Sequence, residues 1–166
     1  GIIREWLLGA HSRHKRGENY PIALIRLLAS NRPRYGGYIV HLSVVLLALG
    51  ITGSSFYGIQ TDVSLYPSET TNVGGYTVKY ITSNILQKSD RTESTAEVQV
   101  FRGDQFLATY YPRRDFYPSF NMASTRATIR STPVEDLYII PGELMDDGRA
   151  VFRILVNPLV MWMWVA

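Results

Sequence analysis

An apolar stretch of twenty residues, 38–57, separates two parts of the chain with different hydropathy patterns. No Asp, Glu, Lys or Arg interrupts it, and aromatic residues flank it at both ends (Tyr35, Tyr38, Phe56 and Tyr57). A helix of this length extends about 30 Å, which matches the hydrocarbon core of a bilayer, and aromatic side chains favour the two membrane–water interfaces. The pattern therefore predicts a transmembrane helix over residues 38–57.

After this stretch, short runs rich in Val, Ile, Thr and Tyr alternate with Gly, Pro, Asn and Asp. Such runs are typical of strands joined by turns, and the alternation of Val98 and Val100 with polar neighbours gives a strand one buried and one wet face. We expect a small antiparallel β domain over residues 58–153, with the tripeptide 102–104 as a hairpin turn. Strands are predicted near residues 75–82, 95–101, 105–111, 125–130, 136–140 and 149–156.

Both ends of the chain show helical patterns. The apolar run over residues 154–166 is too short to cross a bilayer, and we expect it to be the truncated start of a final transmembrane helix, with Asn157 as cap and Pro158 in the first turn. The chain would then be a piece of a longer protein. Residues 2–10 and a segment starting at Pro21 predict helices along a membrane interface, the latter with an apolar face made of Ile22, Ile25, Leu28 and Ala29.

Charge is distributed unevenly. Residues 1–37 carry seven Lys and Arg against two acidic residues, whereas residues 58–166 carry ten against twelve. Basic flanks of a membrane span stay in the cytoplasm, so 1–37 predicts a basic cytoplasmic segment and 58–153 an extracytoplasmic domain. The pI of 9.2 is therefore a topology signal, and nucleic-acid binding is disfavoured because the basic residues do not line an aromatic-bearing face. Zero cysteine excludes thiol chemistry.

His41 lies inside the predicted transmembrane helix. An unpaired imidazole in hydrocarbon costs on the order of several kcal/mol, so it requires a metal or a hydrogen-bond partner. Gly37, Val44, Val45 and Ala48 flank it at helical spacings, which gives a small, flat face against which a macrocycle can lie. Two interpretations follow: His41 is an axial ligand of a haem iron, or it is hydrogen-bonded to a neighbouring helix.

Arg32 and Arg34 precede this helix and are candidate partners for haem propionates through charge-assisted hydrogen bonds. Topology determination alone explains them equally well. Other chemistry is sparse. The pair His11 and His14 lies among cationic neighbours that oppose metal binding, and the chain has no Ser-His-Asp pattern. A third group, Glu143, Asp146 and Asp147, is expected in a solvated turn.

The stretch from Asn31 to Ile51 resembles the pattern Asn-Arg-Arg-Arg-Tyr-Gly-Gly-Tyr-Ile-Val-His-Leu-Gly of the CcmF family, the haem lyase subunit of cytochrome c maturation. The similarity continues in order through residues 73–77, 111–117, 136–138 and 157–164. It covers nearly the whole chain and corresponds to the C-terminal portion of a much larger polytopic protein.

This resemblance implies that His41 is an axial ligand of a haem b within the membrane. The second axial histidine, a tryptophan-rich haem-handling loop and the histidine pair for the substrate haem are then expected before residue 1. Family members receive haem from a haem chaperone. Together with partner subunits that present apocytochrome c, they attach the haem vinyl groups to the thiols of a Cys-x-x-Cys-His motif. The resident haem b is thought to keep the incoming iron reduced.

The same resemblance implies a multi-pass protein of the cell inner membrane, in contact with membrane lipid, with the β domain in the periplasm. The chain would be one part of a haem lyase complex and not catalytic alone. Three residues depart from the family pattern: Ser43 replaces a Gly, and Arg113 and Arg126 stand where many members carry Glu.

Two other functions stay open at this point. In one, the β domain is a docking platform for assembly partners and His41 serves only helix packing. A membrane-tethered sensor would instead have a small-molecule pocket within residues 58–156.

Overall fold

A computed structural model describes residues 4, 7–9, 11, 12, 19, 21, 22, 25, 29 and 32–166, with Arg34 described only through its backbone. The chain forms two compact units, residues 1–48 with 165–166 and residues 49–164, and each is treated by itself. The described residues before Arg32 are helical except Asn19, which agrees with the helices expected over 2–10 and from Pro21. His14, Arg26 and Leu28 lie outside the described residues.

Helix α3 spans Arg32–Tyr57 and therefore begins before the predicted transmembrane stretch. Pro33 fits its first turn, because the ring fixes a helical φ and the missing N–H would have no partner there. The part Tyr35–Tyr57 is long and apolar enough to cross a membrane, judged by length and composition alone.

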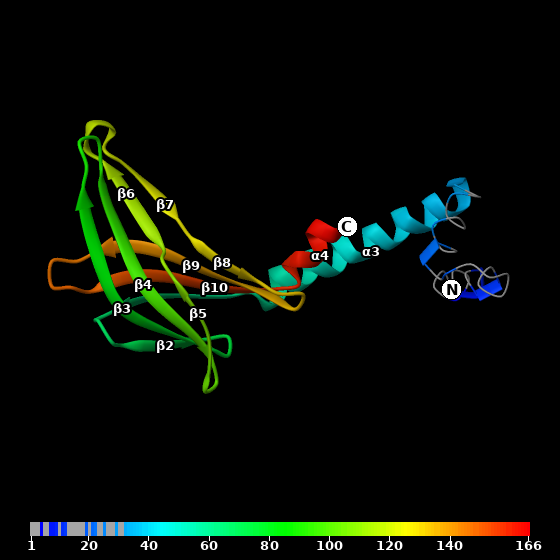
Figure 1. Cartoon of the computed structure of the whole chain (residues 1–166), viewed down its shortest axis with the longest axis horizontal. Helices are drawn as coiled ribbons and strands as arrows, with labels where there is room; N and C mark the ends of the chain where they lie inside the picture. Colours follow the sequence, from blue (N-terminus) through cyan, green and yellow to red (C-terminus); the bar gives the residue numbers. More distant parts are fainter. Residues whose placement is uncertain are drawn as a thin grey trace. The chain divides into compact units, whose positions relative to one another are not determined.

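Ten strands follow within the described part of the chain and form two antiparallel sheets (Figure 1). The four-stranded sheet has the order β1-β10-β9-β8, with β1 Ile59–Leu65, β10 Ala150–Pro158, β9 Glu135–Leu144 and β8 Thr128–Ser131. The six-stranded sheet has the order β2-β3-β4-β6-β7, and β5 also pairs with β4. Its strands are β2 Thr70–Val73, β3 Tyr76–Gln87, β4 Thr92–Arg102, β5 Gln105–Tyr110, β6 Arg113–Tyr117 and β7 Met122–Arg126.

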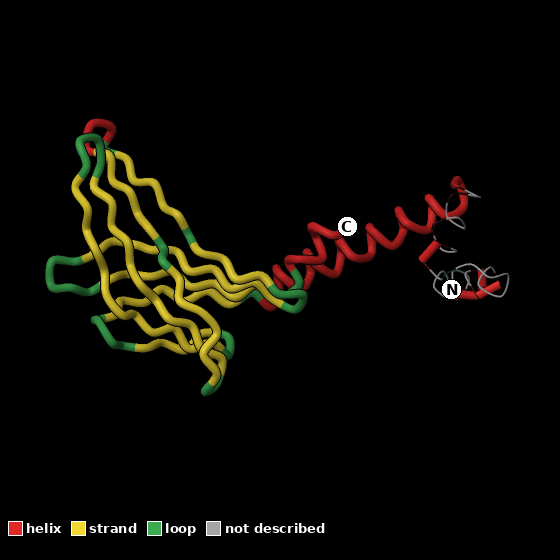
Figure 2. Tube along the Cα trace, viewed as in Figure 1, coloured by secondary structure: helices red, strands yellow, loops and turns green. Residues whose placement is uncertain are grey.

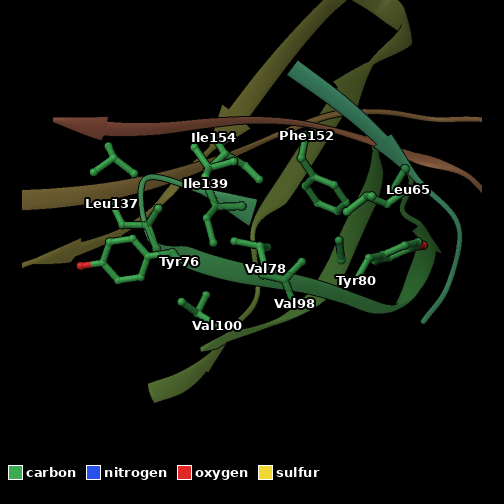
Figure 3. Close-up of a cluster of buried hydrophobic side chains, with 14 residues drawn as sticks. Leu65, Tyr76, Val78, Tyr80, Val98, Val100, Leu137, Ile139, Phe152 and Ile154 are labelled. Atoms are coloured by element: carbon green, nitrogen blue, oxygen red, sulfur yellow. The ribbon is translucent and has the colours of Figure 1, made fainter. Parts of the chain in front are cut away.

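The hydrophobic core lies between these two sheets. Strands β3 and β4 alternate between buried and half-exposed residues, and β9 and β10 supply the facing apolar side chains (Figure 3). Phe152 is fully buried and packs edge-to-face on Tyr80 with ring centroids 5.4 Å apart. The other fully enclosed apolar side chains include Tyr76, Val78, Val98, Val100, Leu137, Ile139 and Ile154.

The chain passes from one sheet to the other between β7 and β8, and Ala127 is the only residue outside both strands at this point. After this crossing, β8 pairs with β9 only from Asp136 to Ile139. The β9–β10 pairing shifts register between the pairs Pro141–Phe152 and Leu144–Ala150, which is a bulge in β9. Figure 2 shows the strands around these connections.

The structure confirms the β domain and its antiparallel sheets, with corrections to individual strands. The predicted strand 125–130 is two strands, β7 and β8, and sequence reasoning missed β1, β2 and β6. The Arg-Gly-Asp tripeptide is the β4–β5 turn as expected, with Gly103 at a positive φ of 59°.

The prediction that the last helix begins at Ile154 is wrong. Residues 154–158 continue β10, and helix α4 spans only Val160–Val165. Asn157 and Pro158 therefore do not cap a helix: they pair with Asp136 and Glu135 on β9.

Helix α4 is held to the end of the sandwich by specific contacts. The Trp162 indole Nε1 donates to the Pro133 carbonyl oxygen at 2.9 Å, and the Leu159 N–H donates to the Val134 carbonyl oxygen at 2.8 Å. The last turns of α3 approach closely, because a Cβ on Gly53 would lie 2.7 Å from Leu159 Cδ1. A side chain at position 53 would force these segments apart.

We expect Phe152→Ala to lower the free energy of unfolding by about 3–5 kcal/mol, because it leaves a cavity between the sheets. The measurement is thermal or denaturant unfolding of the chain in detergent. Phe120→Ala is the matched control, since Phe120 is 77% exposed and its loss should change stability by no more than about 0.5 kcal/mol. Equal effects of the two substitutions would contradict this assignment of the core.

Candidate functional site

His41 lies in the middle of α3 with an exposed side chain. None of the described residues forms a hydrogen bond or ion pair with it. Val44, Val45 and Ala48, which follow it at spacings of three, four and seven, are also exposed, and Gly37 is half-exposed. The imidazole therefore has no partner among the described residues, and Gly37, Val44, Val45 and Ala48 lie beside it on the helix.

Arg32 begins α3 and its side chain is exposed, whereas the Arg34 side chain lies outside the described residues. Both positions are on the same helix as His41. Helical geometry separates them, because seven residues return to within about 20° of the starting direction and nine residues end on the opposite side. Position 34 therefore shares the face of His41, and position 32 does not.

A buried charge network occupies the outer face of β4 and β6. Glu93 and Asp115 are both buried and lie directly opposite each other in the strand pairing, which places like charges side by side. Arg113 joins them: Nη2 lies 3.0 Å from Asp115 Oδ2 and Nη1 lies 3.5 Å from Glu93 Oε2. Lys88 and Arg91 also pair with Glu93, at 2.7 and 2.8 Å.

Arg113 and Arg126, the two arginines that the resemblance led us to expect as departures, belong to this network. They pair with each other across β6 and β7, and Arg126 Nε lies 4.0 Å from Asp115 Oδ2. Both guanidinium groups therefore contact the same oxygen of the buried Asp115 carboxylate, and Oδ1 has no hydrogen-bond partner among the described residues. The two arginines neutralise a charge of the domain itself, in addition to changing its surface.

The Lys88 ammonium holds the pKa of Glu93 below its usual range, with Arg91 and Arg113 adding to the effect against the opposing cost of burial. On the opposite sheet, the Arg153 guanidinium lowers the pKa of Asp62 through a two-point hydrogen bond of 2.7 and 3.0 Å. Both carboxylates are therefore stabilised in the ionised form.

Three adjoining hollows lie where β6 and β7 part from β9 and β10, and Gly142 and Glu143 line all three. The largest has a volume of about 370 Å³. Two ion pairs line it: Arg114 Nη2 to Glu143 Oε1 at 3.3 Å, and Arg153 Nε to Asp62 Oδ1 at 2.7 Å. The other residues lining it are Ala123, Thr125, Ile140, Pro141 and Val151.

The expected acidic turn is confirmed for Asp146 and Asp147, which are exposed, whereas Glu143 does not belong to it and lies on strand β9. The Arg149 backbone N–H and Nε donate to Asp147 at 3.1 and 2.7 Å, within a turn closed by Gly148 at a φ of 87°. Among the described residues, no three His, Asp or Glu side chains are grouped as a metal site would need.

Sequence reasoning found His41 but missed both the network and the hollows. The signal for the network was present, since Arg113, Asp115 and Arg126 are charged residues inside an otherwise β-forming segment. The hollows leave no local signal, because their lining comes from five strands far apart in the sequence.

Stability of the sandwich should fall as the pH is lowered from 6 to 3. A carboxylate whose folded pKa lies below its unfolded value, about 4.3 for Glu and 3.9 for Asp, stabilises the fold fully above that value and loses this contribution as the pH falls through the folded pKa. Glu93→Gln should lower the unfolding midpoint at pH 6 and flatten its pH dependence. The midpoint is followed by denaturant titration at each pH.

Glu97→Gln is the control, since Glu97 lies on the same face of β4 and no Lys or Arg of the described residues pairs with it. This variant should keep the full slope. A slope unchanged in Glu93→Gln would show that the network is not linked to folding.

Comparisons with known proteins all lead to the same family. Residues 56–158 match the family model described as "CcmF C-terminal beta-sandwich". The chain is similar to "Cytochrome c-type biogenesis protein CcmF" of Pseudomonas aeruginosa, with 29% identity over 133 residues that cover 80% of the chain and 20% of the relative. It is also similar to "Probable cytochrome c-type biogenesis protein NrfE" of Escherichia coli, with 27% identity over 143 residues, 86% of the chain and 26% of the relative.

A solved structure titled "Cytochrome c Heme Lyase CcmF" matches with a TM-score of 0.65 and 26% identity, over 99% of this chain and 31% of that chain. The chain spans about a fifth to a quarter of the length of the curated relatives it matches.

Proposed function

The chain belongs to the family of the CcmF C-terminal β-sandwich, and from this premise we propose that it forms part of a haem lyase that attaches haem to c-type cytochromes. Within that assembly we assign it one axial ligand of a haem b, His41. The observation that supports this most directly is an imidazole without a partner among the described residues, on an apolar helix. Because the chain covers only part of its relatives, attachment itself is assigned to the whole complex.

The residues present fit a haem. The donor is an imidazole, the commonest protein ligand of haem iron, and its neighbours Gly37, Val44, Val45 and Ala48 carry no long side chain that would block a flat ring. A bound haem b would supply one-electron redox chemistry, by which the iron of the incoming haem stays reduced. The role of this chain is to hold that group through His41 and to keep the environment of the haem apolar.

Helical geometry favours one of the two candidate propionate partners. Position 34 lies on the His41 face at an axial distance of roughly 10 Å, whereas position 32 points to the opposite side. In this proposal an arginine at position 34 forms charge-assisted hydrogen bonds with carboxylates of the same group that His41 ligates. We assign this role to Arg34 and assign topology determination to Arg32.

In this proposal α3 crosses the inner membrane and contacts lipid through its exposed apolar side chains. Residues 1–37 lie in the cytoplasm and the sandwich lies on the periplasmic side, as the charge asymmetry favours. The partners are then a haem chaperone that delivers haem, apocytochrome c, and the subunits that present its thiols. The relatives' titles support a role in cytochrome c-type biogenesis. The placement in the membrane and these partners are part of the proposal.

His41→Ala should abolish the bis-histidine b-type absorption spectrum of the full-length protein purified from membranes, because the iron loses one of its two strong axial ligands. Haem content by the pyridine haemochrome assay should fall in parallel. Ser43→Ala, two residues away on the same helix, is the matched control and should keep both. A spectrum that persists in His41→Ala would leave His41 only a packing role.

Arg34→Gln should change the reduction potential or the haem occupancy of the purified protein, whereas Arg32→Gln should leave both unchanged. The expected loss of haem affinity is about tenfold, the effect of one charge-assisted hydrogen bond. The potential is measured by spectroscopic redox titration. Equal effects of the two substitutions would contradict the assignment by helix face.

A further inference from the structure

The hairpin turn between β8 and β9 has two apolar residues at its tip, Pro133 and Val134, and Val134 is 63% exposed. Thr132 and Glu135 close the turn through three mutual hydrogen bonds of 2.7–3.1 Å, so the tip is held in one conformation. Single exposed apolar residues are common on protein surfaces. The surroundings of the turn therefore decide whether Val134 has a partner.

Contacts of Leu159 place the turn beside the last turns of α3. The Leu159 N–H donates to the Val134 carbonyl oxygen at 2.8 Å, and a Cβ built on Gly53 would lie 2.7 Å from Leu159 Cδ1. Gly53 lies four residues before Tyr57, the last residue of α3, which is about 6 Å along a helix axis. Turn and helix therefore contact the same residue, about one helical turn before α3 ends.

The strand register gives the same placement independently. Ile59, which begins β1 just after α3, pairs with Val156, and Val156 pairs with Leu137. Val134 lies three residues beyond Leu137 in the direction from which α3 enters, a distance of about 10 Å along a strand. The turn thus extends past the start of β1 and lies alongside the end of the helix.

The end of the sandwich where these segments meet is free of charge. Residues 49–59, 132–134 and 159–164 contain no Asp, Glu, Lys or Arg. The turns at the other end of the sandwich, 88–91 and 145–149, each carry three or more charged residues. An aqueous surface accounts for the charged end. The uncharged end favours an apolar surrounding.

Aromatic side chains gather at the same uncharged end. Phe56, Tyr57 and Trp164 are each more than 70% exposed. Trp162 is held against the turn, because its indole Nε1 donates to the Pro133 carbonyl oxygen at 2.9 Å. Trp and Tyr concentrate at membrane–water interfaces, where an apolar ring and a polar group are both accommodated. These residues are therefore of the kind that contacts lipid near the headgroups.

We propose that the β8–β9 turn is a membrane anchor, which inserts Pro133 and Val134 into the bilayer at the boundary between headgroups and acyl chains. The occupant of this surface is lipid, because the surface is continuous with the end of Tyr35–Tyr57, the segment that is long and apolar enough to span a membrane. Side chains of an interfacial anchor lie about 5–10 Å inside the headgroup region, which agrees with the position of the turn along α3.

The inference rests on the proposed function in one respect, that α3 crosses a membrane. It requires neither haem nor the ligand role of His41. Insertion of a rigid turn that continues directly into β9 would give the sandwich a point of attachment to the bilayer besides the helices.

The test uses the full-length protein, with any other cysteine replaced by serine, in phosphatidylcholine nanodiscs. Residues 1–166 contain no cysteine, so one introduced cysteine carries an NBD fluorophore at a chosen position. Val134→Cys is the test position. Asp146→Cys is the matched control, since it is also an exposed turn residue and the length of β9, roughly 30 Å, separates the two turns. Leu47→Cys reports on the candidate span itself.

Iodide in the water should quench the probe at position 134 about fivefold less than the probe at 146, because the headgroup region excludes the anion. Nanodiscs made with phosphatidylcholine that carries a doxyl group on its acyl chain should quench the probe at 134 and leave that at 146 unchanged. The probe at 47 should be protected from iodide. Near-ultraviolet circular dichroism checks the fold of each variant.

Two results would overturn the anchor while α3 stays in the membrane: equal iodide quenching at 134 and 146, or a probe at 134 that neither iodide nor doxyl lipid quenches. The second result would show that protein, from the same molecule or a second copy, covers the turn. Iodide quenching at position 47 would instead reject the membrane placement of α3 and the anchor together. Quenching at 134 that is unchanged in a His41→Ala background separates this proposal from haem ligation.

Discussion

The packing of β3 and β4 against β9 and β10 is the interaction on which the rest of the structure depends. The chain has no cysteine, so no disulfide supports the sandwich. Each enclosed side chain of the size of Val, Ile or Phe contributes roughly 1.5–3 kcal/mol to the free energy of folding. Phe152 is one of them, and its ring packs on Tyr80 of the opposite sheet. Strand β10 also leads directly into α4 and pairs along its length with β1, which follows α3. The core therefore holds β1 and β10, the strands that follow α3 and precede α4 in the sequence.

How far the sequence predicts each strand depends on where its two faces lie. Strands β3, β4 and β10 have one face in the core and one in solvent, so their hydropathy alternates and the prediction finds them. Strand β6 carries ion pairs on one face and the open hollow on the other, with Arg113, Arg114 and Asp115 in succession. Its pattern reads as a loop, because neither face is packed by apolar residues.

The wrong prediction of a helix from Ile154 also arises because a local pattern does not show which strand lies beside it. Asn157 and Pro158 are common at a helix start, and no local rule separates that role from the end of a strand. The decision is made by β9, whose Asp136 and Glu135 pair with these two residues. His41, by contrast, is predicted from the sequence alone, since a polar residue within an apolar helix is visible without knowledge of its neighbours.

The opening between β7 and β9, where the hollows lie, follows from a few residues in β9. Pro141 cannot donate to a neighbouring strand, and the bulge after it places Gly142 and Glu143 opposite Val151 alone. A Cβ on Gly142 would lie 3.0 Å from Val151 Cβ, closer than ordinary contact, so a side chain there would require Val151 to shift. These features turn the end of β9 away from β7 and prevent closure of the two sheets into a barrel. An unpaired edge invites aggregation unless charge protects it, and Arg126 on β7 together with the Arg114–Glu143 pair provides that charge while leaving the backbone accessible.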